Sequence, residues 1–243
     1  MNEAGQPIND AAGNAGLELE YDEHGNQKES SAFDAAGEAT LVRTGYYRTK
    51  HEHDEWGREK ERRFFNLSEE PATETDKTGA HRVTWKYDDR GNVTSTKLYD
   101  TADEPIAAGE KFFAFAAHEQ RATFDAQNRA ETVAYFDQNG QRLMGPEGWH
   151  GYRIEYDKDG FASATSWFDG KRRPVNEKKR GAHRIEMVND PFGQPSEERF
   201  FDTERNPIST LDGGHHLRKN EYDKAGNLKA QTYFDVDNNP VAD

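Results

Sequence analysis

Histidine and aspartate are the residues of this sequence whose types and spacing could do chemistry. His51, His53 and Asp54 form the densest cluster. If they lie on a β-strand, residues 51 and 53 share a face, and their two imidazoles could hold one metal ion. His53 also stands where related segments carry tyrosine, so it is alternatively a degenerate aromatic position. We predict no bound metal and no cofactor, and these three residues are the candidates if a metal binds.

Five further histidines recur at one position of a repeated pattern. A row of imidazoles could titrate together or bind a transition metal. A histidine close after a glycine at the entrance of a strand more commonly bonds to a neighbouring backbone group, and we predict that role. The five are His81, His118, His150, His183 and His216.

Aspartate recurs with a glycine three residues later. A row of carboxylates could bind calcium. The same pair also closes a turn, in which the aspartate accepts backbone N–H bonds and the glycine takes a positive φ. Because the turn explains every copy without a metal, we assign these residues a structural role. The clearest pairs are Asp22 with Gly25, Asp88 with Gly91, Asp157 with Gly160 and Asp223 with Gly226.

A basic segment stands out in a chain whose formal net charge is −14. It could mark the contact surface of an anionic partner, although charge runs in loops are commonly solvated faces. Its residues are Lys171, Arg172, Arg173, Lys178, Lys179 and Arg180. Nucleic acid is disfavoured by the overall charge, because such binding draws most of its affinity from neutralising phosphates.

Sequence signatures of catalysis are missing. The chain has no Gly-x-Ser-x-Gly, no phosphate-binding Gly-x-x-x-x-Gly-Lys and no His-Glu-x-x-His motif. It also has no cysteine, which excludes disulfides, cysteine nucleophiles and cysteine-based zinc sites. With 46 acidic residues, pairs of carboxylates at glycosidase spacing would occur by chance. We therefore expect a protein that is not an enzyme.

An internal repeat must position all of these residues. In seven copies an aspartate or its equivalent is followed twelve residues later by a second aspartate or asparagine, while the distance between copies varies from 32 to 37 residues. A constant internal spacing with variable outer spacing indicates a rigid unit joined by variable loops. We predict a single repeat domain over residues 1–243. Its units are approximately 13–44, 45–78, 79–115, 116–147, 148–180, 181–213 and 214–243.

Alternation of apolar and polar residues predicts that each unit is a β-hairpin. Val83, Trp85 and Tyr87 alternate with polar residues before one Asp-x-x-Gly turn. We predict an all-β fold in which tandem β-hairpin repeats form an elongated twisted sheet or solenoid-like array, with stacked aromatic rings filling its inner side. A seven-bladed β-propeller is the alternative. The segment from Lys111 to Gln120 is the nearest candidate for a turn of helix.

Proline followed by isoleucine or valine comes after the second aspartate of several units. We expect this short segment to pair with or cap the hairpin. The chain opens on Pro7-Ile8 and closes on Pro240-Val241, which is the same phase of the repeat. This agreement predicts a segment of a longer protein with flanking domains. No apolar run is long enough to be a transmembrane helix.

The motif Tyr-Asp-x-x-Gly-Asn, followed by an aromatic-Asp pair and Pro-Val or Pro-Ile, resembles the YD-type repeats of bacterial Rhs and teneurin-like proteins. It is still more similar to 33-residue arrays of large bacterial proteins without assigned activity. The resemblance covers essentially the whole chain and rests on Tyr87-Asp88, Tyr156-Asp157 and Tyr222-Asp223 with their glycines. It departs from the Rhs pattern in its two unequal half-units and in mostly lacking arginine after the glycine.

This resemblance implies a non-catalytic scaffold or binding module of a larger bacterial protein. Exposed aromatic residues would recognise a protein or a glycan. The alternative is part of an Rhs-like shell that encases a toxin or enzyme domain. The resemblance also leans towards a bacterial cell-surface, secreted or periplasmic location.

Overall fold

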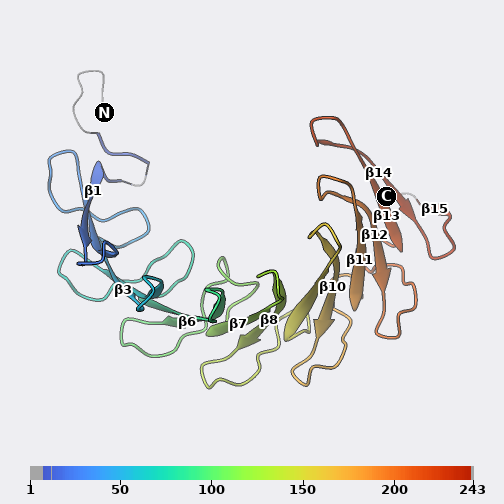
Figure 1. Cartoon of the computed structure of the whole chain (residues 1–243), viewed down its shortest axis with the longest axis horizontal. Helices are drawn as coiled ribbons and strands as arrows, with labels where there is room; N and C mark the ends of the chain where they lie inside the picture. The colour runs from blue at the N-terminus through green and yellow to red at the C-terminus, as the bar shows by residue number, and fades with distance from the viewer. Residues whose placement is uncertain (1–7, 12, 242–243) are drawn as a thin grey trace. The chain divides into compact units, whose positions relative to one another are not determined.

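Antiparallel β-strands make up all of the regular structure in the described residues, 8–11 and 13–241, of the computed structural model. The strands form seven successive hairpins and one short final strand (Figure 1). They are β1 (Gly16–Tyr21), β2 (Gln27–Phe33), β3 (Arg48–His53), β4 (Glu59–Phe65), β5 (Arg82–Tyr87), β6 (Val93–Tyr99), β7 (Glu119–Phe124), β8 (Ala130–Phe136), β9 (Gly151–Tyr156), β10 (Ala162–Phe168), β11 (Arg184–Asn189), β12 (Pro195–Phe201), β13 (Leu217–Tyr222), β14 (Leu228–Phe234) and β15 (Pro240–Val241). The predicted all-β hairpin array is confirmed.

Strand order follows the sequence from β1 to β15, and each strand is hydrogen-bonded to its neighbours in that order. A propeller divides its strands into separate blades of about four strands each. The continuous order contradicts that alternative. The physical reason is that each hairpin from β3–β4 to β11–β12 uses both of its outer edges to pair with the hairpins before and after it.

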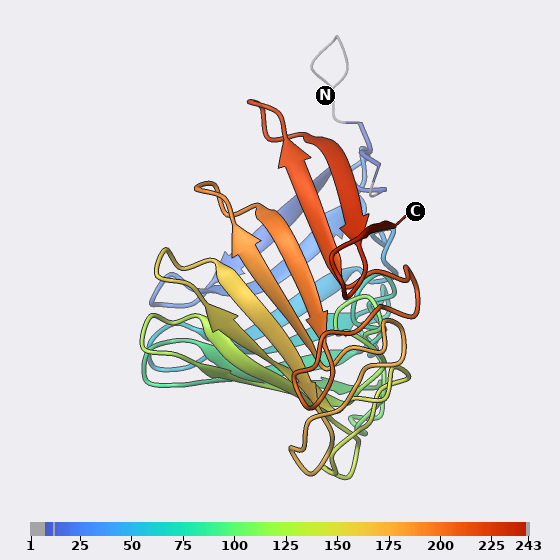
Figure 2. The same cartoon turned by 90° about the vertical axis from the view of Figure 1, so that its right-hand side faces the viewer.

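Two compact units divide the chain, one of Met1–Arg121 with Phe136–Gln141 and the other of Ala122–Tyr135 with Arg142–Asp243. We call them unit 1 and unit 2. Hairpins β1–β2, β3–β4 and β5–β6 belong to unit 1, and hairpins β9–β10, β11–β12 and β13–β14 belong to unit 2. Figure 2 shows the hairpins of unit 2 side by side, with their tight turns at one edge and the longer connections at the other.

A β-bulge lies beside the turn of the hairpins. In β5–β6 the pairs run from Arg82 with Tyr99 to Lys86 with Ser95, and the register then shifts so that Tyr87 pairs with Val93. The same shift occurs in hairpins β1–β2, β3–β4, β9–β10, β11–β12 and β13–β14. Because a bulge re-aims the side chain beside it, this shift sets the direction of the residue that precedes each Asp-x-x-Gly turn.

The proline segments pair with the hairpins, as expected. Pro71, Pro105, Pro174 and Pro207 form isolated bridges to the aromatic residue before the second aspartate or asparagine. Pro240 pairs with Phe234 in the same way, as part of β15. The expectation for Pro7 lies outside the described residues.

Aromatic rings lie on both faces of the hairpins, not on one inner side as expected, because consecutive residues of a strand point to opposite faces. One face holds the buried column, formed by the residue two positions before the second Asp or Asn. This column comprises Ala32, Phe64, Leu98, Tyr135, Trp167 and Phe200. On the opposite face, cations cover the next residue: the guanidinium carbon of Arg82 is 3.7 Å from the ring centroid of Tyr99, and that of Arg121 is 3.8 Å from Phe136.

The segment from Lys111 to Gln120 forms no helix, so this expectation is wrong. The N–H groups of Phe112 and Phe113 both bond to the carbonyl of Gly109, which closes a single turn. Ala108 and Ala117 then form a β-bridge, and Phe113 is buried. Pairing and burial of the loop therefore compete successfully with helical hydrogen bonds. In the described part of the chain no helix is long and apolar enough to cross a membrane.

Candidate functional site: a groove at the turn edge

The carboxylate of each Asp-x-x-Gly turn accepts two backbone N–H bonds. Asp88 Oδ1 lies 3.0 Å from the nitrogen of Arg90 and 2.9 Å from that of Asn92, and Gly91 has a φ of 88°. A side-chain bond from Asn92 lowers the pKa of Asp88 below its ordinary value. Asp22, Asp157 and Asp223 make the same pair of backbone bonds, and Gly25, Gly160 and Gly226 have positive φ.

The sequence analysis missed that the second turn of each unit is the same device. Asn66 Oδ1 accepts the N–H groups of Ser68 and Glu70, and Asp202 Oδ1 accepts those of Glu204 and Asn206. The residue with positive φ is here often not glycine, as at Glu69, Asp103, Arg172 and Arg205. The sequence signal that could have predicted this turn is the constant Asp or Asn at the first position of the second turn. Asn128, which replaces the glycine of the fourth copy, has the expected positive φ of 63°.

The five recurring histidines bond to backbone carbonyls through Nδ1. The distance is 2.8 Å from His118 to Leu98 and 2.9 Å from His216 to Phe200. His81, His150 and His183 bond instead to carbonyls of the segment that follows the second turn, those of Ala72, Leu143 and Val175, at 3.1 to 3.3 Å. Burial lowers the pKa of His118, His150 and His183. This geometry is the structural role that the sequence predicts for them.

The His51 cluster is brought together at the turn edge of unit 1. His51 Nδ1 is 2.5 Å from Glu59 Oε1, and its Nε2 is 2.8 Å from Thr49 Oγ1. Burial alone would raise the pKa of Glu59, but hydrogen bonds from His51 and Arg62 hold it below its ordinary value. Both ring nitrogens of His51 are therefore engaged. In the described residues no group of three or more His, Cys, Asp or Glu is arranged to hold a metal ion.

A groove of ≈ 650 Å³ runs between the turns of hairpins β1–β2 and β3–β4. We call it the Trp56 groove. Its lining consists of Asp22, His24, Asn26, Lys28, His51, His53, Asp54, Glu55, Trp56 and Gly57. All three metal candidates thus lie in one concave surface, together with an aromatic residue that the sequence analysis did not single out.

Trp56 is the central feature of this groove. This residue is 70% exposed, although the guanidinium carbon of Arg58 lies 4.6 Å from its ring centroid. Asp54 is engaged in the turn, because its Oδ1 accepts backbone N–H bonds and its Oδ2 is 2.7 Å from Arg58 Nε. Within the described chain, Lys28 and His53 have no side-chain hydrogen bond or ion pair. The groove therefore offers an aromatic ring beside polar groups that are available to a ligand.

The basic segment lies in unit 2, on the second turn of one repeat and the loop that follows. Arg173 is paired with Asp169 at 2.7 Å, and Arg180 lies 3.8 Å from Glu177. Lys178 Nζ donates to the carbonyl of Pro146 at 3.1 Å. Half of the six residues therefore have partners within the chain, while Lys171, Arg172 and Lys179 are exposed and form no ion pair among the described residues.

Comparison with known proteins gives no family. No protein-family model and no curated protein matches the chain. Solved structures that are similar include TcdB2–TccC3–Cdc42, at 14% identity and a TM-score of 0.41 over 92% of this chain and 11% of that one. TcdB2–TccC3 without its hypervariable C-terminal region has 13% identity and a TM-score of 0.39 over 96% of this chain and 12% of that one.

A Photorhabdus luminescens Tc holotoxin pore has 12% identity and a TM-score of 0.33 over 90% of this chain and 12% of that one. The chain thus spans about a tenth of the length of these structures. Likenesses of this size carry no conclusion about its activity or partners.

Proposed function

We propose that this chain is a non-catalytic repeat scaffold that binds a glycan through the Trp56 groove. The observation that carries the proposal is the exposed Trp56 in a groove whose polar side chains include Lys28 and His53, which have no partner among the residues that the structure describes. An aromatic ring can stack on the apolar face of a sugar, while nearby donors and acceptors bond its hydroxyl groups.

The size of the groove favours a glycan over a protein as the partner. Its volume of ≈ 650 Å³ lies within the range of about 300–1,000 Å³ that is usual for small-ligand sites. A stable protein partner would bury roughly 800 Å² on each side, which needs a broad surface with a desolvated centre. Asp22 and Asp54 are engaged in capping their turns, so Lys28, His53 and Glu55 are the side chains that would contact sugar hydroxyls.

Binding of the labelled protein to an array of glycans tests this proposal. We expect Trp56→Ala to abolish binding to the glycans that the native chain retains. The matched control is Phe192→Ala, because Phe192 is 84% exposed at the same position of another Asp-x-x-Gly turn but does not line the groove. Equal binding by both variants, with unchanged melting temperatures, would show that the groove is not the site.

The alternative function is part of an Rhs-like shell around a toxin or enzyme domain, and the YD-type repeat motif supports it. A shell contains its cargo, so it requires no ligand in the Trp56 groove. In that case the glycan array stays blank for the native chain. A co-expressed flanking domain of the longer protein would instead resist protease only while the array is folded.

A further inference from the structure

We propose that the loop before β13 binds a small carboxylate, which takes the place of a glutamate side chain that two other loops of the chain supply themselves. This loop, residues 210–215, lies in unit 2 and directly precedes His216, one of the recurring histidines. The Trp56 groove lies in unit 1, so the proposal does not depend on glycan binding there.

A buried glutamate closes the equivalent loop of the preceding repeat, residues 177–182. Glu177 Oε2 accepts the backbone N–H of Lys179 at 2.8 Å, and its Oε1 accepts that of Arg180 at 2.7 Å. Each oxygen of the planar carboxylate therefore takes one of two consecutive N–H groups, which together form a concave site for an anion. The loop that follows packs against this one through the N–H of Leu211, which bonds to the Arg180 carbonyl at 2.8 Å. The glutamate thus keeps its bonds where a further repeat adjoins.

Glu74 has the same role in a loop of unit 1. It is also buried, and its carboxylate accepts the N–H groups of Asp76 and Thr78, both at 2.8 Å. Burial alone would raise the pKa of Glu74, but the bonds from Thr78 and Asp76 hold it below its ordinary value. The backbone of such a loop therefore stabilises the charge of a carboxylate.

The loop of residues 210–215 has the same backbone frame as the Glu177 loop. The N–H of Glu177 bonds to the Ala182 carbonyl at 2.8 Å, and the N–H of Thr210 bonds to the carbonyl of the last residue of its own loop at 2.9 Å. In both loops a glycine at the fifth position donates its N–H to the carbonyl of the first residue at 2.8 Å. Thr210 therefore holds the position of Glu177.

Thr210 cannot replace the glutamate that closes the other loops. Its hydroxyl ends two bonds short of where a glutamate carboxylate ends, and its buried Oγ1 has no hydrogen-bond partner in the described structure. The N–H groups of Asp212 and Gly213, the third and fourth residues of the loop, also bond to no described group. Because polar groups without partners are costly when they are shielded from water, these groups favour an anion that accepts hydrogen bonds from them.

A pocket of ≈ 190 Å³ lies beside these two N–H groups. Asp212 and Gly213 line it, together with Arg180 of the preceding loop. The guanidinium of Arg180 makes no hydrogen bond among the described residues and lies 3.8 Å from Glu177, whose carboxylate is already bonded to the backbone. Arg180 is therefore available to pair with a carboxylate, and such charge-assisted hydrogen bonds are strong.

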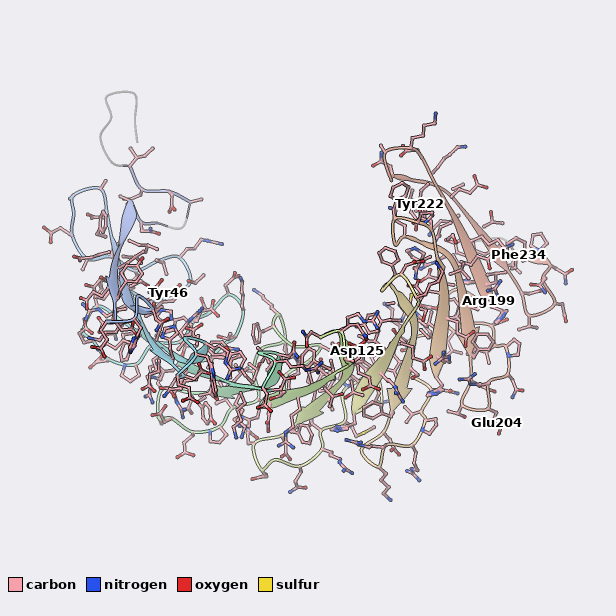
Figure 3. The ribbon with its side chains drawn as sticks, in the orientation of Figure 1. Tyr46, Asp125, Arg199, Glu204, Tyr222 and Phe234 are labelled. Atoms are coloured by element: carbon pink, nitrogen blue, oxygen red, sulfur yellow. The ribbon has the colours of Figure 1, made fainter. Side chains whose placement is uncertain are left out.

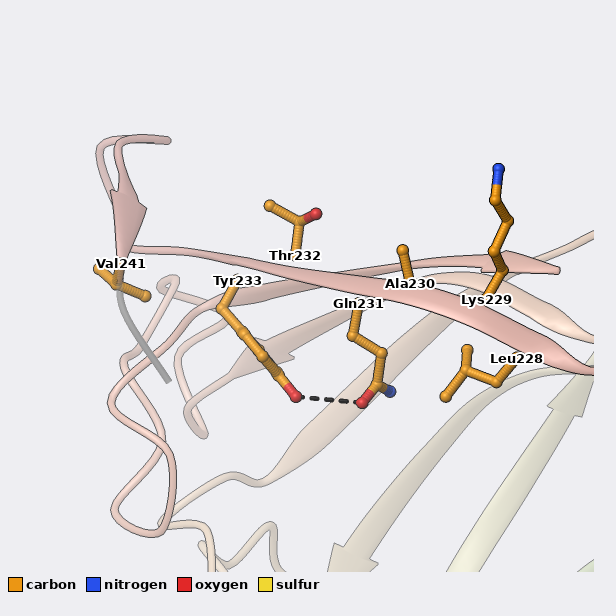
Figure 4. Close-up of a pocket in the computed structure, with 7 residues that line it drawn as sticks. All are labelled: Leu228, Lys229, Ala230, Gln231, Thr232, Tyr233 and Val241. Atoms are coloured by element: carbon orange, nitrogen blue, oxygen red, sulfur yellow. Dashed lines mark hydrogen bonds between the residues drawn. The ribbon is translucent and has the colours of Figure 1, made fainter.

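Aromatic rings line the pocket and limit it to a small organic acid. Phe200 and Tyr233 both line it, and the ring centroid of His215 lies 5.5 Å from that of Phe200 and 4.8 Å from that of Tyr233. His215 Nδ1 donates to the Gly213 carbonyl, and the Tyr233 hydroxyl donates to Gln231, both at 3.1 Å (Figure 4). These bonds fix the rings against which the apolar part of the acid would pack.

Two acidic side chains also line the pocket. Glu198 forms an ion pair with Arg218, so its charge is compensated. Asp212 is exposed and forms no ion pair in the described chain. Since Asp212 would repel an anion, removing its charge should strengthen the binding of a carboxylate.

Titration with sodium acetate at constant ionic strength tests the site. In a chain isotope-labelled at the glycine nitrogens, we expect the amide signal of Gly213 to move saturably, because its N–H gains an acceptor. Glucuronate in place of acetate tells two sources of the carboxylate apart: tighter binding of glucuronate identifies an acidic sugar, and equal or weaker binding identifies a free small acid. No saturable movement with either, or equal movement with sodium sulfate, would overturn the proposal.

Variants of the loop test the role of the missing glutamate. Thr210→Glu supplies the carboxylate from the chain itself, so we expect a higher melting temperature and no response of Gly213 to acetate. Thr210→Val is the matched control, which still binds acetate. Arg180→Met should weaken binding about tenfold or more through the lost charged hydrogen bond, and Asp212→Asn should strengthen it.

An unchanged acetate response in Arg180→Met would contradict the site even if Thr210→Glu did not fold. Trp56→Ala should bind acetate as the native chain does. A blank glycan array would therefore leave the acetate result standing, and a failed acetate titration would not affect the proposal for the Trp56 groove.

Discussion

The phenol of Tyr87 donates a hydrogen bond to the backbone carbonyl of Glu59, 2.6 Å away in the preceding hairpin. The bond crosses from one hairpin to the next and joins residues that are 28 positions apart. Tyr156 bonds to Ala130 and Tyr222 to Pro195 in the same way. Where tyrosine is replaced by Asn189, its amide reaches the equivalent carbonyl of Ala162 at 2.8 Å. The residue before each of these four turns therefore ties its hairpin to the one before it.

This bond sets the direction of the tyrosine within a hairpin. Tyr222 and Phe234 project to opposite sides of hairpin β13–β14 (Figure 3). Tyr222 reaches back to the preceding hairpin, whereas Phe234 is covered by Lys219, whose Nζ lies 5.4 Å from the ring centroid.

Removing the hydroxyl of Tyr87 tests the tie between hairpins. We expect Tyr87→Phe to lower the free energy of unfolding by about 0.5–1.5 kcal/mol, because the carbonyl of Glu59 loses its donor. Phenylalanine keeps the ring on which Arg58 stacks at 4.7 Å, so the change isolates the hydrogen bond. Tyr21→Phe is the control, since Tyr21 is 58% exposed and no hairpin precedes its own among the described residues. Equal effects of the two variants in urea denaturation would show that the bond contributes nothing.

The role of the turn carboxylates can be separated from calcium binding. We expect Asp88→Ala to lower the melting temperature more than Asp88→Asn does, because an amide oxygen still accepts the two backbone N–H bonds. Calcium or a chelator should leave the melting temperature unchanged, with Asp89→Ala as a control for the loss of one exposed charge. If calcium raised the melting temperature, and both substitutions at Asp88 abolished that rise, the carboxylates would be metal ligands.

Backbone conformation at the turns predicts one substitution that destabilises the fold and one that stabilises it. Gly91 has a φ of 88° and no atom within 4 Å of an added Cβ, so Gly91→Val tests backbone strain without a clash. We expect it to destabilise by about 1–3 kcal/mol. Arg205 has a φ of 65°, and we expect Arg205→Gly to stabilise by up to about 1 kcal/mol. Thermal melts of both variants check these predictions. If both variants melted at a lower temperature than the native chain, or both at a higher one, positive φ would not be what determines the effect of these substitutions.

Buried histidines should make stability depend on pH. Burial lowers the pKa of His118, so the folded state favours the neutral ring more than the unfolded state does. The stability that it contributes is present above the unfolded pKa of about 6.5 and is lost as the pH falls from there through the lower folded pKa. We expect melting temperatures to fall over this range and His118→Gln to flatten the fall. His24→Gln, at an exposed position, should follow the native curve.

Local chemistry explains why much of the fold could be predicted from the sequence. The turn at Asp88 requires only hydrogen bonds to residues at most four positions away and a glycine at position 91. The bond from His81 to the carbonyl of Ala72 likewise joins residues only nine positions apart. The Trp56 groove could not be predicted in this way, because it forms only when the turn of hairpin β3–β4 comes to lie beside that of β1–β2.

By itself, the sequence determined that this chain folds into hairpins, because the Asp-x-x-Gly turns, the period-two alternation and the paired proline segments are short-range features. The tertiary structure decided which of two adjacent residues is buried, as with Phe64 and its neighbour Phe65. It also decided that the hairpins join in one continuous strand order and that Tyr87 reaches Glu59. These features depend on pairing between hairpins, which joins residues far apart in the sequence, such as Glu29 with Lys50, and no local pattern specifies such pairs.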